Sequence, residues 1–278
     1  MKQLQARAPT GYAALLLMVC VAMGVHTVAD AQSTEDILTL NAAISNFERS
    51  SGQADRDPYR HPAETLAFFG IRPDMTVVEL WPGGGWYTEI LAPYLAERGR
   101  LYLAHFSPHA KAGFRKRLLQ RTYDWLESRA YRHVEVTTLS KGHYNLAPAG
   151  TADLVLTFRN LHNWLAQGYL EEVFQASYRA LKPGGILGIV EHRAPEGRSM
   201  RWMNRAGYVS QSLTVDMAKK AGFKLLATSE INANPKDTKD YARGVWTLPP
   251  RLIEGDTDRD IYLSIGESDR MTLKFIKP

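Results

Sequence analysis

The stretch TVVELWPGGGWYTEIL, residues 76–91, has the residue pattern of a ligand-binding turn. An apolar run ends in the acid Glu79, the glycines Gly83–Gly85 follow, and an amphipathic segment resumes. This order predicts a strand, a tight turn and a helix. Glycine lets the backbone come close to a ligand, and the first turn of a helix offers free N–H groups. Trp81 and Pro82 stand inside the turn, where small residues are expected.

The glycine spacing argues against several common ligand sites. Gly83 and Gly85 fit the first two positions of the dinucleotide fingerprint G-x-G-x-x-G, but Thr88 occupies the third. The match is therefore weak for a nicotinamide cofactor. No Gly-Lys-Ser/Thr follows the glycines, so the turn is not a phosphate loop, and the chain has no G-x-S-x-G nucleophile motif.

Two further groups of polar residues follow predicted strands. The segment TFRNLHNW supplies Arg159, Asn160 and His162 after one strand, and EHR (residues 191–193) ends the next. Imidazole titrates near neutral pH, so a histidine at this place can act as a general base. A hydrogen-bonded loop histidine is the alternative. Residues 191–193 are second candidates for substrate contact.

The histidine spacing predicts no metal site. The histidines of the predicted domain are scattered, and no H-x-x-x-H or H-x-H pair occurs.

Strands and helices alternate along most of the chain. Apolar runs predict seven strands, at residues 76–80, 100–106, 133–139, 152–159, 186–193, 223–231 and 270–278. Amphipathic or capped segments predict helices at residues 36–50, 63–70, 87–99, 112–128, 169–181 and 212–223. This alternation predicts an α/β fold, a doubly wound and mostly parallel sheet with helices on both faces. GESD, residues 266–269, reads as the turn of a C-terminal antiparallel hairpin between two apolar runs.

The N-terminus has the pattern of an export signal. Basic residues precede the apolar run YAALLLMVCVAMGV, and ADA at residues 29–31 fits an A-x-A cleavage site. Cleavage after Ala31 predicts a periplasmic or secreted protein without stable membrane insertion. An uncleaved anchor is the alternative. Cys20, the one cysteine, lies in the apolar run, so the mature chain would need no disulfide and have no thiol nucleophile.

The composition fits one globular domain behind this leader. The 278 residues are 45% hydrophobic and 23% charged, with a net charge of +5 and no dense Lys/Arg tract. We therefore expect a small-molecule substrate and no nucleic-acid partner. The predicted organisation is a signal peptide at residues 1–31, a helical extension at residues 32–57 and the main domain at residues 58–278.

Four segments together resemble a known family. VVELWPGGGWYTEIL, ADLVLTFRNLHNW, RALKPGGILGIVEHR and AGF occur in this order and with suitable gaps. Together they resemble the class I S-adenosylmethionine-dependent methyltransferases. More narrowly, the chain is similar to an exported bacterial group of predicted methyltransferases that carry ELWPGGGWYT. The resemblance covers residues 57–278 and implies a Rossmann-like, mostly parallel seven-stranded sheet.

The resemblance implies a cofactor site around the glycine turn. Glu79 matches the acid that pairs with the amino group of S-adenosylmethionine (SAM), and Gly83, Gly84 and Gly85 match the loop that approaches the cofactor. Tyr87 follows at the pocket rim.

Two positions of this turn and the next strand depart from the family pattern. Trp81 replaces the first glycine, and packs either against the cofactor or in the core. His105 replaces the acid that holds the ribose hydroxyls, and a neutral imidazole accepts one hydrogen bond where a carboxylate accepts two.

The family also implies roles for TFRNLHNW, which faces the methyl group and the incoming nucleophile. Arg159, Asn160 and His162 are therefore the predicted catalytic residues, with His162 as general base and Asn160 also at the cofactor. The predicted function is SAM-dependent methyl transfer to a small-molecule acceptor.

Two other functions stay open. Because Trp81 and His105 alter the site, and because SAM is a cytoplasmic cofactor, an exported methyltransferase-like protein that binds a small ligand without catalysis is the main alternative. A nicotinamide-dependent oxidoreductase is a third, disfavoured by Thr88 and His105.

Overall fold

The computed structural model describes residues 33–109, 113–129 and 131–278. The chain divides into two compact units, Met1–Ala31 and Gln32–Pro278, and the second is described below. The predicted signal peptide, with Cys20 and Ala31, lies outside the described residues. In the three described stretches, none of the helices is both long and apolar enough to cross a membrane.

A single eight-stranded sheet forms the centre of the second unit, in the order β4-β3-β2-β1-β5-β6-β8-β7. The strands are β1 (Thr76–Leu80), β2 (Arg100–His105), β3 (Val134–Ser140), β4 (His143–Asn145), β5 (Ala152–Phe158), β6 (Leu181–His192), β7 (Lys224–Ser229) and β8 (Arg270–Ile276). Neighbours from β3 to β6 run parallel, whereas β4, β8 and β7 pair antiparallel with their neighbours. This confirms the predicted α/β fold, with its mostly parallel sheet and antiparallel C-terminal strands.

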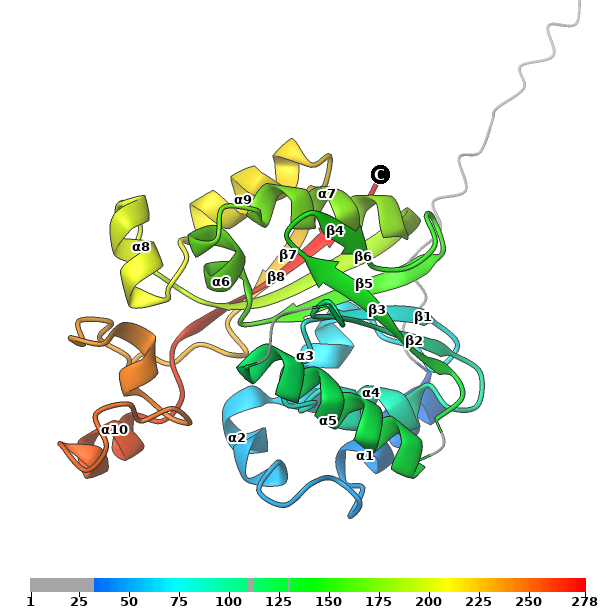
Figure 1. Cartoon of the computed structure of the whole chain (residues 1–278), viewed down its shortest axis with the longest axis horizontal. Coiled ribbons are helices and arrows are strands. Elements are labelled where there is room, and N and C mark those ends of the chain that lie inside the picture. Colours follow the sequence, from blue (N-terminus) through cyan, green and yellow to red (C-terminus); the bar gives the residue numbers. More distant parts are fainter. Residues whose placement is uncertain (1–32, 110–112, 130) are drawn as a thin grey trace, which may run out of the picture. The chain divides into compact units, whose positions relative to one another are not determined.

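Helices cover both faces of the sheet (Figure 1). On one face lie α1 (Thr34–Ile44), α2 (Asp57–Arg60), α3 (Pro62–Phe69), α4 (Thr88–Tyr94) and α5 (Phe114–Arg129). On the other lie α6 (Leu161–Ala166), α7 (Leu170–Ala180) and α9 (Gln211–Lys220). Other short elements are η1 (Ala54–Arg56), α8 (Met200–Ala206), η2 (Gly244–Thr247) and α10 (Arg259–Ile265).

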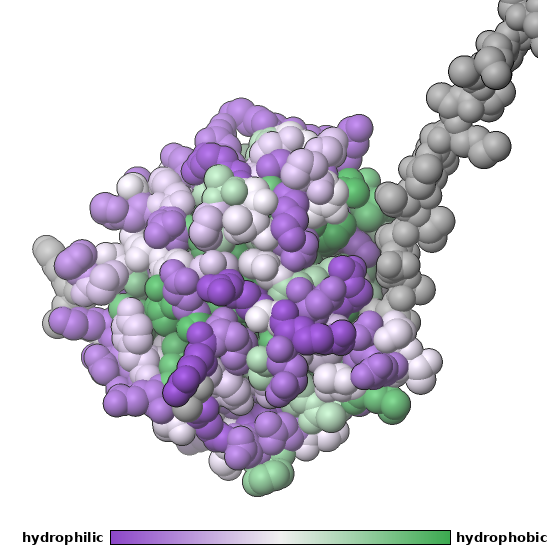
Figure 2. Space-filling view, turned by 90° about the vertical axis from the view of Figure 1, so that its right-hand side faces the viewer, coloured by the Kyte–Doolittle hydropathy of each residue, from purple (hydrophilic) through white to green (hydrophobic). Residues whose placement is uncertain are grey.

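The core consists of two hydrophobic clusters, one on each face. Successive residues of a strand point to opposite faces, so Val77 packs in one cluster and Val78 in the other. Both are fully buried, as a parallel strand covered on both sides requires. Figure 2 shows a face on which hydrophilic residues predominate and hydrophobic residues form smaller separate areas.

Two details of the predicted sheet are wrong. The sheet has eight strands rather than seven, because β4 turns back on β3 for three residues. The apolar run before GESD forms α10 rather than the first strand of a hairpin. The reason is that β8 already pairs with β6 on one side and β7 on the other, so no edge is left for another strand.

The C-terminal strand places a distant segment beside the parallel strands. Arg270 at the start of β8 pairs with His192 at the carboxyl end of β6. Residues 267–269 therefore lie at the same edge of the sheet as the ends of β1 and β5, where ligands bind in doubly wound folds.

Candidate functional site

The turn between β1 and α4 has backbone angles that need glycine at two positions. Gly83 has a φ of 63° and Gly85 a φ of 83°, in the left-handed region that favours glycine. Trp81 also lies there, with a φ of 49°, which is strained for a bulky residue. Gly84 has no positive φ. Within the described residues, a Cβ at Gly84 would meet no atom within 4 Å, so the fold itself does not require glycine there.

Glu79 ends β1 below this turn and is 3% exposed. Its carboxylate accepts one hydrogen bond, from the Thr88 hydroxyl at 2.6 Å. Burial raises the pKa of Glu79 to about 7, and the Thr88 hydrogen bond opposes this rise. A cation beside the carboxylate would hold it in the charged form. The site thus suits a cationic group such as an ammonium.

A cavity of about 190 Å³ opens between the glycine turn and the loop after β5. The structure brings seven of the predicted site residues together along its wall: Glu79, Trp81, Gly83, Gly84, Tyr87, Arg159 and Asn160. Their sequence positions differ by up to 81, and the pairing of β1 with β5 brings them together. The predicted grouping of the glycine turn with TFRNLHNW is thereby observed as a shared cavity.

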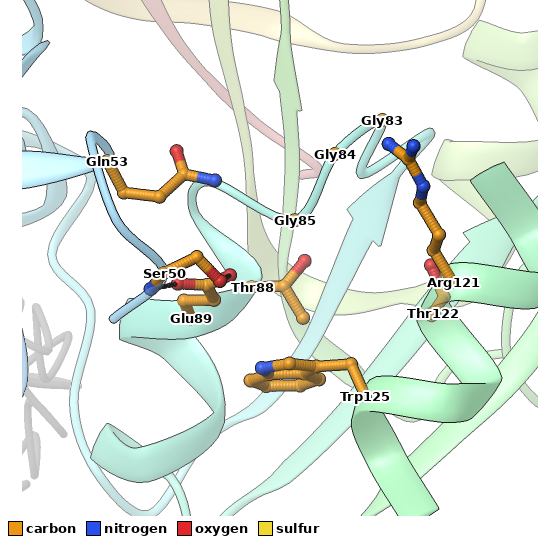
Figure 3. Close-up of a pocket in the computed structure, with 10 residues that line it drawn as sticks. All are labelled: Ser50, Gln53, Gly83, Gly84, Gly85, Thr88, Glu89, Arg121, Thr122 and Trp125. Carbon is orange, nitrogen blue, oxygen red and sulfur yellow. Dashed lines mark hydrogen bonds between the residues drawn. The ribbon is translucent and has the colours of Figure 1, made fainter. Parts of the chain in front are cut away.

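A second cavity, of about 320 Å³, lies against the glycine turn and is shown in Figure 3. Its lining residues are Ser50, Gln53, Gly83, Gly84, Gly85, Thr88, Glu89, Arg121, Thr122 and Trp125. Glu89 accepts hydrogen bonds from the backbone and hydroxyl of Ser50, both at 2.6 Å, which fixes the segment before α2 against α4. Gly83 and Gly84 line both cavities, so the turn is accessible from two directions.

Asn160 holds the two loops of the first cavity together. Its Nδ2 donates to the carbonyl oxygens of Leu80 at 2.9 Å and Trp81 at 3.2 Å. These carbonyls belong to the start of the glycine turn. The amide therefore orients that turn, and this use of its donor fits a positioning residue.

Trp81 packs mainly in the core. It is 6% exposed, and its indole N–H donates to the Leu139 carbonyl at 2.7 Å. Its ring lies 4.6 Å from Phe106 and 5.4 Å from Trp164, between ring centroids. The edge of the ring that remains accessible lines the cavity.

His105 lies at the end of β2 and is fully buried. Its Nδ1 accepts from the Phe106 N–H at 2.8 Å, and Nε2 lies 3.2 Å from the Thr122 hydroxyl. Burial lowers the pKa of His105 to about 4, so the ring is neutral at physiological pH. The residues lining the two cavities do not include His105, although its partner Thr122 lines the second.

His162 begins α6 and forms a pair with Glu191 that spacing alone does not predict. His162 Nδ1 lies 2.9 Å from Glu191 Oε1. The carboxylate also accepts the N–H groups of Leu161 at 2.5 Å and His192 at 2.9 Å. Hydrogen bonding to Glu191 favours a proton on Nδ1 and leaves Nε2 as the basic nitrogen. The imidazole is buried and does not line the first cavity.

His162, Glu191 and His192 also form the group of potential metal ligands found among the described residues. One ligand atom from each lies within 4.8 Å of the others. All three are buried. His192 Nδ1 lies 2.5 Å from the Ser268 hydroxyl, and Glu191 is bonded as above, so the cluster is satisfied by protein partners.

We expect Glu191→Gln to destabilise the fold by about 3 kcal/mol. The amide NH₂ of glutamine would face one of two backbone N–H donors, and a buried donor without an acceptor is costly. Urea unfolding of this variant measures the loss. Glu172→Gln, on the exposed side of α7, is the matched control and should change stability by less than about 0.5 kcal/mol. Equal midpoints for the two variants would contradict the Glu191 network.

Arginines are the site residues that the sequence analysis missed. Arg56 and Arg60 come from a stretch expected to be a loop, yet both line the first cavity with Arg159. Their i, i+4 spacing was the available signal, since it places both on one face if the segment is helical. Their partner Glu267 lies more than 200 positions away, which no local pattern reveals.

Comparison with known proteins agrees with this geometry. Residues 78–189 match the family model described as a methyltransferase domain, a region that runs from β1 to β6. A search of the curated proteins found no match.

Solved structures with the same fold include methyltransferases and one cyclase. A SAM-dependent methyltransferase from Aquifex aeolicus is 18% identical, with a TM-score of 0.51 over 64% of this chain and 87% of that one. The cyclase SpnF is 17% identical, with a TM-score of 0.55 over 87% and 93%. Phosphoethanolamine N-methyltransferase 2 from Haemonchus contortus, solved with SAM, is 14% identical, with a TM-score of 0.55 over 87% and 56%. These likenesses establish the fold.

Proposed function

We propose that this chain is a SAM-dependent methyltransferase that acts on a small-molecule acceptor. The observation that carries the proposal is the buried Glu79 carboxyl, which faces a cavity made by the glycine turn within the region that matches a methyltransferase domain. The structural likeness to methyltransferases supports the same fold. The exported bacterial group and a periplasmic location belong to the proposal and rest on the sequence alone.

The residues around the turn fit the amino-acid end of SAM. Glu79 would pair with the ammonium group, and the ion pair would keep the carboxylate charged. Gly84 leaves room for close approach, because the space beside its Cα is open. Tyr87 stacks on Phe158 at 3.5 Å between centroids and forms a firm wall of the cavity. When bound, SAM supplies an electrophilic methyl group, and the protein's part is alignment and desolvation.

Three residues near the loop after β5 would assist the acceptor. Asn160 holds the glycine turn in place, as its bonds to Leu80 and Trp81 indicate. Arg159 would contact the acceptor from the cavity wall. His162, oriented by Glu191, would accept a proton on Nε2 from a hydroxyl or amine acceptor after local opening of the loop.

One observation favours a second function, small-ligand binding without methyl transfer. His105 stands in place of a ribose-binding acid and uses both ring nitrogens inside the protein. Trp81 fills space in the core beside the turn. A protein of this kind would bind a ligand in the first cavity and would not respond to S-adenosylhomocysteine.

Gly84→Ala tests the proposed function with little effect on folding. We expect the affinity for S-adenosylhomocysteine to fall about tenfold, because a methyl group would occupy the ligand's place. The unfolding midpoint should stay within about 2 °C, since the residue has ordinary φ and open space. Isothermal titration and thermal unfolding measure the two quantities.

Gly83→Ala is the contrasting variant, because its φ of 63° strains alanine and should lower the midpoint as well. The proposed function is contradicted if the wild-type chain shows no binding of S-adenosylhomocysteine at millimolar concentration. Unchanged affinity in Gly84→Ala would show that the nucleoside compound binds elsewhere.

A further inference from the structure

Three guanidinium groups line the first cavity, from Arg56, Arg60 and Arg159. They surround one buried acid, Glu267, and a fourth arginine, Arg270, lies behind it. The nearest nitrogen of each arginine lies 2.6 Å (Arg56), 3.4 Å (Arg60), 3.7 Å (Arg159) and 3.3 Å (Arg270) from a Glu267 carboxylate oxygen.

The charges of this arginine cluster do not balance. Four guanidinium groups face one carboxylate, which leaves three positive charges. Burial alone would raise the pKa of Glu267, but the four arginines lower it to about 2, so Glu267 is fully ionised. Glu79 lies on the same cavity wall, and even its full ionisation would leave two positive charges. Uncompensated buried charge is costly, so a bound anion would stabilise this arrangement.

Arg60 shows the deficit most directly. The residue is 3% exposed, and its Nη2 has no hydrogen-bond partner among the described residues. Its pKa is lowered by burial and by the nearby Arg159. A buried guanidinium donor that faces a cavity without an acceptor is unusual, because guanidinium groups normally use their donors in pairs on carboxylate or phosphate.

The backbone supports the same site. Arg159 has a φ of 60°, in the left-handed region, and its N–H donates to Val190 at 2.7 Å. The residue after Arg60, His61, is left-handed as well, with a φ of 43°. Strained conformations of this kind concentrate where side chains are held for binding.

We propose that the first cavity binds a doubly charged oxyanion, of the phosphate class, through Arg56, Arg60 and Arg159. The inference rests on the proposed function for its meaning, since it makes the methyl acceptor a phosphorylated or similarly acidic small molecule. The carboxylate of SAM is the other source of an oxyanion here. SAM also carries an ammonium and a sulfonium, so its methionine end is net positive and does not offset the arginine cluster.

Inorganic phosphate is the probe for this site. Isothermal titration of the whole chain is made at constant ionic strength, with chloride as the reference anion. We expect saturable phosphate binding by the wild-type chain and a loss of at least about tenfold in affinity for Arg159→Gln and for Arg56→Gln. Both side chains are partly exposed, and thermal unfolding of each variant verifies that it is folded. Arg98→Gln removes one charge at a side chain that is 60% exposed, and should bind phosphate like wild type.

The outcomes separate the possible ligands. Phosphate binding that persists with saturating S-adenosylhomocysteine supports an acceptor site. Loss of phosphate binding on addition of that compound assigns the arginines to the cofactor carboxylate and overturns the inference. Equal affinities for wild type, Arg159→Gln and Arg56→Gln overturn it as well. Arginine-dependent phosphate binding without any binding of S-adenosylhomocysteine would support the anion site and contradict the proposed methyltransferase function.

Discussion

Replacing Glu79 by glutamine is expected to make the chain more stable at pH 8 and to abolish its affinity for SAM. The folded-state pKa of about 7 lies above the value of 4.5 for an unperturbed glutamate, because burial disfavours the charge. The folded chain therefore loses stability as pH rises from about 4.5 to 7, and the loss is complete above 7. At 1.36 kcal/mol for each pKa unit, the full penalty is roughly 3 kcal/mol.

Glutamine removes this penalty while its oxygen can still accept from Thr88. The stabilisation should be near zero at pH 4.5, grow between pH 4.5 and 7, and stay constant above, as urea unfolding across this range would measure. The affinity for SAM should fall at least about tenfold at pH 8, since the charged partner of the ammonium is gone. Glu135→Gln, on the exposed side of β3, is the control and should change neither quantity. A Glu79→Gln chain that is less stable than wild type at pH 8 would contradict the cost assigned to the buried carboxylate.

Replacing Trp81 by glycine is expected to lower stability by about 3 kcal/mol and to leave the binding of S-adenosylhomocysteine intact. Removing a buried tryptophan costs about 3–5 kcal/mol, and here Leu139 also loses the indole donor. Glycine relieves the left-handed strain at this position, which recovers about 1 kcal/mol. In a domain of this size the midpoint should fall by roughly 10 °C.

This variant distinguishes the two roles considered for Trp81. A wall of the core predicts lost stability with retained affinity, whereas packing against the cofactor predicts a loss of both. Trp81→Phe keeps the ring contacts and removes only the indole N–H, so we expect a smaller loss of about 1–2 kcal/mol. A change below about 1 kcal/mol in Trp81→Gly would show that the indole does not pack as described.

The sheet was predictable wherever a strand is a continuous apolar run. The segments TVVEL and ADLVLTF are buried on both faces and form β1 and β5 near the predicted positions. The error at residues 260–265 arose because a short apolar run fits a strand or a helix equally well. Pairing of β8 on both sides decided this case, and pairing is a property of the whole sheet.

The site was predictable where its residues follow strand ends. Glu79 and Arg159 end neighbouring parallel strands, so their meeting in one cavity follows from the fold class. The partners of Arg60 and His162 were not predictable in this way. Glu267 reaches Arg60 through an irregular segment of about 40 residues before β8, and Glu191 was assigned to substrate contact although its carboxylate points at His162.

The central claim is that the glycine turn holds SAM, and NMR of the chain labelled with ¹⁵N-glycine tests it most directly. The 21 glycines give a sparse spectrum, and substitution of Gly83, Gly84 and Gly85 one at a time assigns the turn. Titration with S-adenosylhomocysteine should shift these three signals and leave Gly150 and Gly255, outside both cavities, unchanged. Signals of the turn that do not move at saturating ligand would contradict the account.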